Sequence, residues 1–302
     1  MRRDNRLKSW HLLDDAEQRS CRVTGIVPRD YPGEVAEEWP DLLEILHRRV
    51  KPERDNQKRK ALRIRWWQYA EKRPGLRKAV APLERVIACS RIGNAFAFTF
   101  LPKGVIANEK TVVFASDRAA TLSVLSSRAH ETWARFFSST LKDDLQYTPS
   151  DCFESFPLPP HFEANSQLEG TGRTYYEHRA ALMVARNEGM TKTYNRFHDG
   201  AETAEDIQRL RDLHAEMDRA VLEAYGWHDL AARAEPIFLD EENEDDHTYQ
   251  GRLFWTSDFR DEVLARLLAL NAERHAEEVR LGIAPGMKGK RADEDEEELE
   301  DL

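Results

Sequence analysis

One segment rich in Lys and Arg, with aromatic residues among them, is the part of the sequence best suited to chemistry. Residues 48–78 contain thirteen Lys or Arg and three Asp or Glu, a local net charge of +10. Cations on long side chains bind phosphate groups, and five lie within about two helical turns. We therefore expect these five residues to contact duplex DNA: Lys58, Arg59, Lys60, Arg63 and Arg65.

The aromatic residues beside these cations leave two roles open. Trp66, Trp67 and Tyr69 could pack their helix against the body of the protein, or they could stack on a base or sugar. The cations themselves could also form a solvated helix surface without a ligand. Composition alone does not choose between these roles.

A second group of candidate DNA contacts lies in and beside the turns of a β-rich region. Arg and Lys side chains can reach guanine edges and Asn can reach adenine edges. The alternative is that Asn94 and Asn108 are ordinary turn residues, which is common for this residue type. The five candidates in this region are Arg91, Asn94, Lys103, Asn108 and Lys110.

Net charge does not exclude a nucleic-acid partner. The 302-residue chain carries −10 overall, so the sequence outside residues 48–78 carries −20, much of it in the acidic runs 240–246 and 293–301. A polyanion responds to the field of one face, and not to the total charge. No apolar run approaches the roughly 20 residues of a membrane span, so we expect a cytoplasmic protein without a membrane partner.

The sequence contains no complete catalytic or metal-binding motif. Its three cysteines are far apart and have no His at zinc-ligand spacing, which argues against a zinc site and a disulfide framework: Cys21, Cys89 and Cys152. Residues 189–200 combine Lys192, Tyr194, Arg196, Phe197 and His198 in an expected inter-helix loop. This loop could be an active site, but a packed loop is the simpler interpretation, and we assign no catalytic residue and no metal ligand.

The elements that position these residues indicate an α+β fold. Two helices are expected in residues 34–73, interrupted at Pro52, and the first carries an apolar stripe of Val35, Trp39, Leu42, Leu43 and Leu46. A small antiparallel β unit follows, with strands in 85–102, 104–116 and 119–127. Phe96, Phe98 and Phe100 alternate there and should share one face of a strand.

The C-terminal half is expected to be mainly helical. A helix capped by Ser126 or Ser127 should turn Trp133, Phe136 and Phe137 inward. Three more helices end at Gly189, Gly226 and Gly282, and the second has a stripe of Ile207, Leu210, Leu213, Met217 and Val221. The parts are a basic helical lead-in (1–85), a β-containing domain (86–165), a helical module (166–285) and a disordered acidic tail (286–302).

Residues 147–160, "YTPSDCFESFPLPP", form the connector between the β region and the helices. Its prolines enforce extended backbone and block helix continuation. Ser150 or Asp151 could cap a short turn, while Phe153 and Phe156 are free to anchor the segment. We expect the connector to hold the two regions together.

Three stretches resemble the C-terminal half of large adenine-specific DNA methyltransferases of type II restriction-modification and related phage-defence systems. The resemblance covers residues 34 to 282. The quoted stretches are "VKPERDNQKRKALRIRWWQYAEKRPGL", "SSRAHETWARFFSSTLKDDLQYTPSDCFESFPLP" and "TKTYNRFHD" with "IQRLRDLHAEMDRAVLEAYGW". The resemblance implies that residues 86–165 recognise a target sequence in double-stranded DNA.

The sequence also departs from that family. An asparagine-proline-proline-tyrosine motif, which holds the flipped adenine, is absent, and so is the glycine-rich loop that binds S-adenosylmethionine. We therefore expect a DNA-recognition fragment that is inactive alone and works with a catalytic methyltransferase domain on another chain, which would bind the cofactor. The alternatives are an independent nuclease, or a non-enzymatic module whose basic helix meets an acidic protein.

Overall fold

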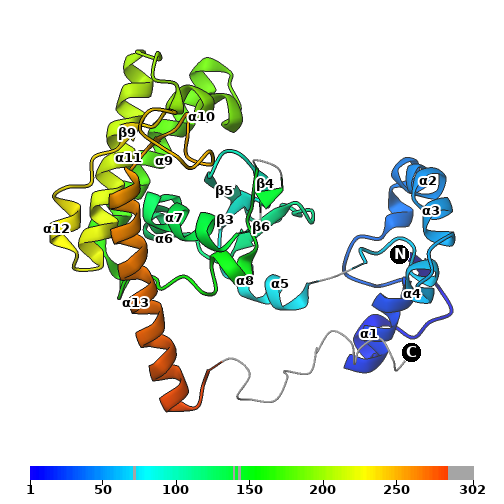
Figure 1. Ribbon diagram of the computed structural model, residues 1–302. Helices are drawn as coiled ribbons and strands as arrows, with labels where there is room; N and C mark the ends of the chain where they lie inside the picture. The colour runs from blue at the N-terminus through cyan, green and yellow to red at the C-terminus, as the bar shows by residue number, and fades with distance from the viewer. Residues whose placement is uncertain (71–72, 139, 142–143, 285–302) are drawn as a thin grey trace. The chain divides into compact units, whose positions relative to one another are not determined.

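The computed structural model describes residues 1–70, 73–138, 140–141 and 144–284 (Figure 1). They form two compact units, residues 1–74 and the residues from Gly75 onward. The expected β region (86–165) and the C-terminal helices thus lie in the same unit, although the sequence assigns them to separate regions. The expected disordered tail, 286–302, lies outside the described residues.

The first unit is built from short elements. Strands β1 and β2 pair in parallel, and α1 begins with a capping box formed by Asp14 and Glu17. Gly25 ends α1 at a positive φ, and a Cβ there would come within 2.8 Å of the Trp67 ring. The elements are β1 (Arg2–Asp4), η1 (Trp10–Leu12), α1 (Asp15–Thr24), β2 (Ile26–Pro28), η2 (Ala36–Glu38), α2 (Pro40–Arg49), α3 (Lys51–Asp55) and α4 (Lys60–Ile64).

Two predictions for this unit are wrong. The second basic helix is not continuous, because α3 ends at Asp55 and α4 begins only at Lys60. Arg63 compensates for the interruption by donating to the backbone oxygens of Gln57 (2.7 Å) and Lys58 (3.0 Å). The first helix is also shorter than expected, because α2 begins only at Pro40, and its apolar stripe is divided: Val35 is buried, whereas Trp39 is 52% and Leu42 58% exposed.

The second unit contains the expected antiparallel strands. β3 is the central strand between β5 and β6, with Cys89 opposite Phe98 and Ser90 opposite Thr111. Phe96, Phe98 and Phe100 are all buried, as their alternation predicts. The strands are β3 (Arg85–Ser90), β4 (Ile92–Gly93), β5 (Phe98–Pro102), β6 (Thr111–Phe114), β7 (Thr140–Leu141), β8 (Asp144–Gln146), β9 (Ile237–Phe238) and β10 (Leu253–Phe254).

Helices make up most of the second unit. The stripe of α11 is buried as predicted, and α13 ends at Gly282 in the left-handed region, also as predicted. Ser127 caps α7 by accepting from the backbone N–H of His130. The helices are α5 (Pro74–Val80), α6 (Ala119–Ser126), α7 (Arg128–Phe137), α8 (Pro149–Cys152), η3 (Phe162–Ala164), α9 (Ser166–Arg186), α10 (Met190–His198), α11 (Glu205–Ala224), α12 (His228–Ala231) and α13 (Ser257–Leu281).

Two of these helices contradict the sequence prediction. Residues 119–126 form α6 and not a strand; all eight are buried, so the segment has no polar face to reveal a helical period. The expected loop at 189–200 contains α10, whose buried face is Thr193, Tyr194 and Phe197. Phe136 and Phe137 are a third correction, because both lie on the exposed side of α7.

The connector joins two hydrophobic clusters, as expected. Phe153 packs against Phe114 of the β unit, with ring centroids 5.0 Å apart, whereas the buried Phe156 lies in the cluster formed with α7, α11 and α13. Asn271 and Arg274 of α13 donate to backbone oxygens of the connector. The predicted capping role of Ser150 or Asp151 is wrong, because Thr148 precedes α8 and both residues lie inside the helix.

Candidate nucleic-acid interface

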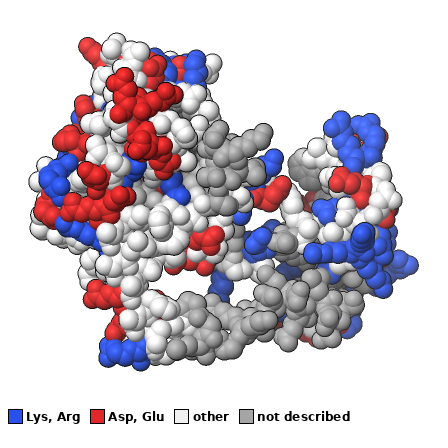
Figure 2. Space-filling model, viewed as in Figure 1, with Lys and Arg blue, Asp and Glu red and all other residues white. Residues whose placement is uncertain are grey.

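The basic segment, defined as residues 48–65, presents cations that the protein itself does not neutralise. Lys58, Arg59 and Lys60 are exposed, and among the described residues none forms an ion pair. Lys51 differs, since its Nζ lies 2.7 Å from Asp55 Oδ2. Figure 2 shows Lys and Arg gathered over the unit that carries α2, α3 and α4. Free cations on one face are the requirement for binding a polyanion.

The interruption between α3 and α4 determines how these cations are presented. Lys58 and Arg59 lie in the loop before α4 and Lys60 is the first residue of that helix. Arg63 holds the loop through its two backbone hydrogen bonds. Arg63 therefore has a positioning role in addition to its charge, whereas the three residues before it are free to reach phosphates.

The two tryptophans pack within their own unit. Trp67 lies against Gly25, and Trp66 contacts the imidazole of His47 with ring centroids 4.6 Å apart. Both are only partly exposed, so the packing role, one of the two left open by the sequence, is the one observed. Tyr69, at 61% exposed, is the remaining ring available for stacking.

The fold brings together only part of the second candidate group. The backbone N–H of Arg91 donates to the oxygen of Lys110, and its Nε donates to that of Glu109. Lys103 lies at the opposite end of strand β3, where its Nζ donates to the oxygen of Ala81. The six residues of β3 span roughly 17 Å. Arg91 and Lys110 therefore lie near enough to each other to contact one ligand group, whereas Lys103 lies too far from them to share it.

The two asparagines are held by other residues. Asn108 Oδ1 accepts from the backbone N–H of Lys110 (3.0 Å), the hydrogen bond of an ordinary turn. Asn94 Oδ1 accepts from Nη2 of Arg252, a residue 158 positions away in the sequence. Each amide therefore retains its Nδ2 group as the part that can donate to a ligand.

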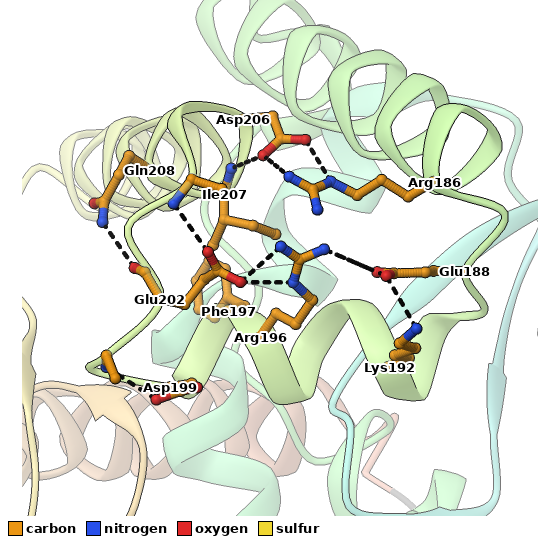
Figure 3. A network of polar contacts seen from close by, with 12 residues as sticks. Arg186, Glu188, Lys192, Arg196, Phe197, Asp199, Glu202, Asp206, Ile207 and Gln208 are labelled. Atoms are coloured by element: carbon orange, nitrogen blue, oxygen red, sulfur yellow. Dashed lines mark hydrogen bonds and ion pairs between the residues drawn. The ribbon is translucent and has the colours of Figure 1, made fainter.

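The cations of α10 are neutralised, in contrast to those of the basic segment. Arg196 pairs with both Glu188 and Glu202, and Lys192 pairs with Glu188 at 3.2 Å (Figure 3). Arg186 of α9 forms a similar ion pair with Asp206 of α11. This network ties three helices together, so it is structural and leaves little charge for a ligand.

A pocket of about 270 Å³ lies beside α10 in the second unit. Asn94, Tyr194 and His198, which the sequence singles out in separate segments, line it together with the loop 247–252. The loop contributes Arg252, a residue that sequence reasoning missed. No local signal identifies it, because its importance comes from contacts with residues distant in the chain.

Residues 36–160 of the chain are similar to a known family. They match the family described as MmeI, target recognition domain. A solved structure of the type IIL restriction-modification enzyme MmeI in complex with DNA is also similar, with a TM-score of 0.52 and 16% sequence identity. The match covers 81% of this chain and 28% of that chain, and shows a shared fold; no curated protein matches the sequence.

The matched segment includes the basic segment, the strands β3 to β6 and the connector. All ten residues predicted to contact DNA lie within it. It begins at residue 36 and contains residues of both compact units.

The described residues contain no candidate metal site and no candidate membrane span. No group of three or more His, Cys, Asp or Glu there could hold a metal ion. In that same part of the chain, no helix is long and apolar enough to cross a membrane. The three cysteines are free thiols, and burial raises the pKa of Cys89 to about 12.

Proposed function

We propose that this chain binds double-stranded DNA and recognises a target sequence for a restriction-modification methyltransferase. The match of residues 36–160 to the MmeI target recognition domain carries the proposal. The basic segment supports it independently, because Lys58, Arg59 and Lys60 are exposed and have no carboxylate partners among the described residues. In this proposal the basic segment holds the phosphate backbone, and the β unit reads base edges through Arg91 and Lys110.

The proposed reaction is methyl transfer to the N6 amine of adenine, after the base is flipped out of the duplex. The resemblance of the sequence to adenine-specific DNA methyltransferases supports this choice of base. A catalytic domain outside these 302 residues would bind S-adenosylmethionine and carry out the transfer. Isothermal titration of the chain with S-adenosylmethionine should accordingly give no heat of binding, and micromolar affinity would contradict this division of labour.

The salt dependence of DNA binding tests the proposed role of the basic segment. Each phosphate contact contributes roughly 0.9 to the slope of log affinity against log salt concentration. Replacing Lys58, Arg59 and Lys60 together with Gln should therefore lower the slope by about 2.7 if each contacts one phosphate. Affinity should fall alike for all duplex sequences, because phosphates carry no sequence information.

A matched control removes the same charge elsewhere. Arg173, Arg209 and Arg219 lie on α9 and α11, and each pairs with a glutamate. Their triple replacement with Gln should leave the slope unchanged. If a folded Lys58, Arg59 and Lys60 variant kept the wild-type slope, the DNA-binding site would have to lie elsewhere.

A further inference from the structure

The pocket beside α10 is formed by three segments that are far apart in the sequence. The turn before β5 contributes Asn94 and Ala95, and α10 contributes Tyr194, Asn195 and His198. The loop between β9 and β10 contributes His247, Thr248, Gln250, Gly251 and Arg252. Its volume of about 270 Å³ is smaller than the roughly 300 to 1,000 Å³ of pockets for drug-sized ligands. The pocket therefore suits a small group more than a large apolar molecule.

Arg252 is the charged side chain of this pocket, and it is only 7% exposed. Its Nε donates to the oxygen of Thr248 (3.0 Å), and its Nη2 donates to the backbone and side-chain oxygens of Asn94. All of these acceptors are uncharged. Among the described residues, the one carboxylate paired with Arg252 is Glu131, whose Oε1 lies 3.8 Å from Nη1.

The Glu131 carboxylate already accepts hydrogen bonds from another guanidinium group. Arg135 donates to Glu131 Oε1 from both Nε (2.9 Å) and Nη2 (2.7 Å). The neighbouring Asp218 is likewise held by Arg128. Three guanidinium groups in this region thus share two carboxylates, and Arg252 has only the longer contact of 3.8 Å with a carboxylate that Arg135 also binds.

A buried cation that shares its counterion is costly. Burial and the charge of Arg135 lower the pKa of Arg252 to about 10, and the charge of Glu131 opposes this shift only in part. The same field acts on His198, where burial and the charges of Arg252 and Arg128 hold the pKa well below its usual value. The pocket is therefore a region of positive potential, which an anion would relieve.

Two further polar side chains of the pocket, those of Asn94 and His198, have a free N–H group. His198 Nδ1 accepts from the backbone N–H of Leu253 (3.1 Å), so the proton of the neutral ring is on Nε2. The Asn94 oxygen faces Arg252, which can only donate, so Nδ2 is the free end of that amide. A cation and two N–H donors are the groups that recognise an oxyanion.

We propose that this pocket binds a phosphate group, with Arg252 as its counterion and with Asn94 and His198 as hydrogen-bond donors. The phosphate is either a backbone phosphodiester of bound DNA or the phosphate of a small molecule such as a mononucleotide. Phosphate binding by this pocket does not depend on the proposed function. Only the assignment of the phosphate to bound DNA rests on that function.

Titration of the full chain with inorganic phosphate, against potassium chloride at equal ionic strength, tests the site. Asn94→Asp is the decisive variant, because the new carboxylate is isosteric with the amide and pairs with Arg252. The variant should melt at the wild-type temperature or higher, yet bind phosphate at least tenfold more weakly. A merely structural Asn94 would not separate stability from binding in this way.

Arg252→Gln should also lose phosphate binding, and Arg233→Gln is its control because Arg233 pairs with Glu262 on the exposed surface. The ring nitrogen signals of His198 should shift with phosphate in the wild-type chain alone. Equal phosphate binding by the wild type and by Asn94→Asp would overturn the proposal. So would the absence of binding up to about 10 mM phosphate, which corresponds to a very weak site.

DNA binding by the same variants identifies the source of the phosphate. A salt slope lower by roughly one in Asn94→Asp assigns the pocket to the DNA backbone. An unchanged slope together with weakened binding of adenosine monophosphate assigns it to a small phosphorylated ligand. Either result supports the proposal that the pocket binds a phosphate group. Failure of the proposed function would appear separately, as an unchanged slope in the variant of Lys58, Arg59 and Lys60.

Discussion

The ring of Phe156 lies against the imidazole of His130, with centroids 4.7 Å apart. This contact joins the connector to α7 at a point where both side chains are buried. Tyr147, at the start of the connector, also reaches His130 through its hydroxyl, 3.2 Å from Nε2. Tyr147 and Phe156 of the connector thus both contact His130.

Removing the Phe156 ring should destabilise the second unit. Truncation of a buried Phe to Ala typically costs about 3 to 5 kcal/mol, a large share of a domain's stability. We expect Phe156→Ala to lower the melting temperature by several degrees or more, measured by calorimetry.

Asp151→Asn is the matched change on the same connector. Asp151 is exposed and accepts a hydrogen bond from the Ser150 hydroxyl, which an amide oxygen can also accept. Its melting temperature and DNA binding should therefore stay close to those of the wild type. Loss of DNA binding in an Asp151→Asn chain that melts normally would show that the connector is itself a functional site.

Lowering the pH should reduce the free energy of unfolding through the protonation of His130. Burial lowers the pKa of His130 to about 4, whereas the unfolded chain titrates near 6.5. The folded state therefore favours the neutral ring, and its full contribution to stability is present above pH 6.5. As the pH falls from 6.5 to 4 the unfolded chain gains a proton first, so stability should drop by up to about 3 kcal/mol.

Urea unfolding at pH 7 and pH 4.5 measures this effect. His130→Gln removes the titrating group, so its unfolding free energy should vary less with pH than that of the wild type. His198 shifts in the same direction and remains in the variant, so a smaller residual dependence is expected. An identical pH dependence in both chains would show that His130 is not the responsible group.

Gly172 and Gly170 allow a paired test of the contact between α6 and α9. A Cβ on Gly172 would lie 2.2 Å from both the backbone oxygen of Ala119 and the hydroxyl of Ser123, whereas Gly170 has nothing within 4 Å. Gly172→Ala should therefore destabilise the fold by about 1 to 3 kcal/mol through overpacking. Gly170→Ala should stabilise it by about 0.5 to 1 kcal/mol, because alanine favours the helix.

Chemical denaturation of the two variants checks this prediction. The two changes add the same methyl group to the same helix, so their difference isolates the packing against α6. Equal effects on the unfolding free energy would mean that the helices can move apart without cost.

Sequence alone was sufficient wherever structure follows a local pattern. The buried stripe of α11, the left-handed stop of α13 at Gly282 and the alternating Phe96, Phe98 and Phe100 all follow from periodicity and capping. The excess of cations in the basic segment is likewise a property of composition. These features depend on residues a few positions apart, so the sequence displays them directly.

Only the tertiary structure decided the features that depend on distant residues. Helix α6 is buried on all sides, which removes the polar face that would mark it as a helix. The pairing of Lys192 and Arg196 with glutamates also required the folded chain. So did the finding that Lys58 and Lys60 have no such partner within the part of the chain that the structure describes. The pocket beside α10 shows the physical reason most clearly. Asn94 accepts a hydrogen bond from Arg252, which is 158 positions away in the sequence. Whether a buried charge is compensated therefore depends on which distant residues the fold places around it.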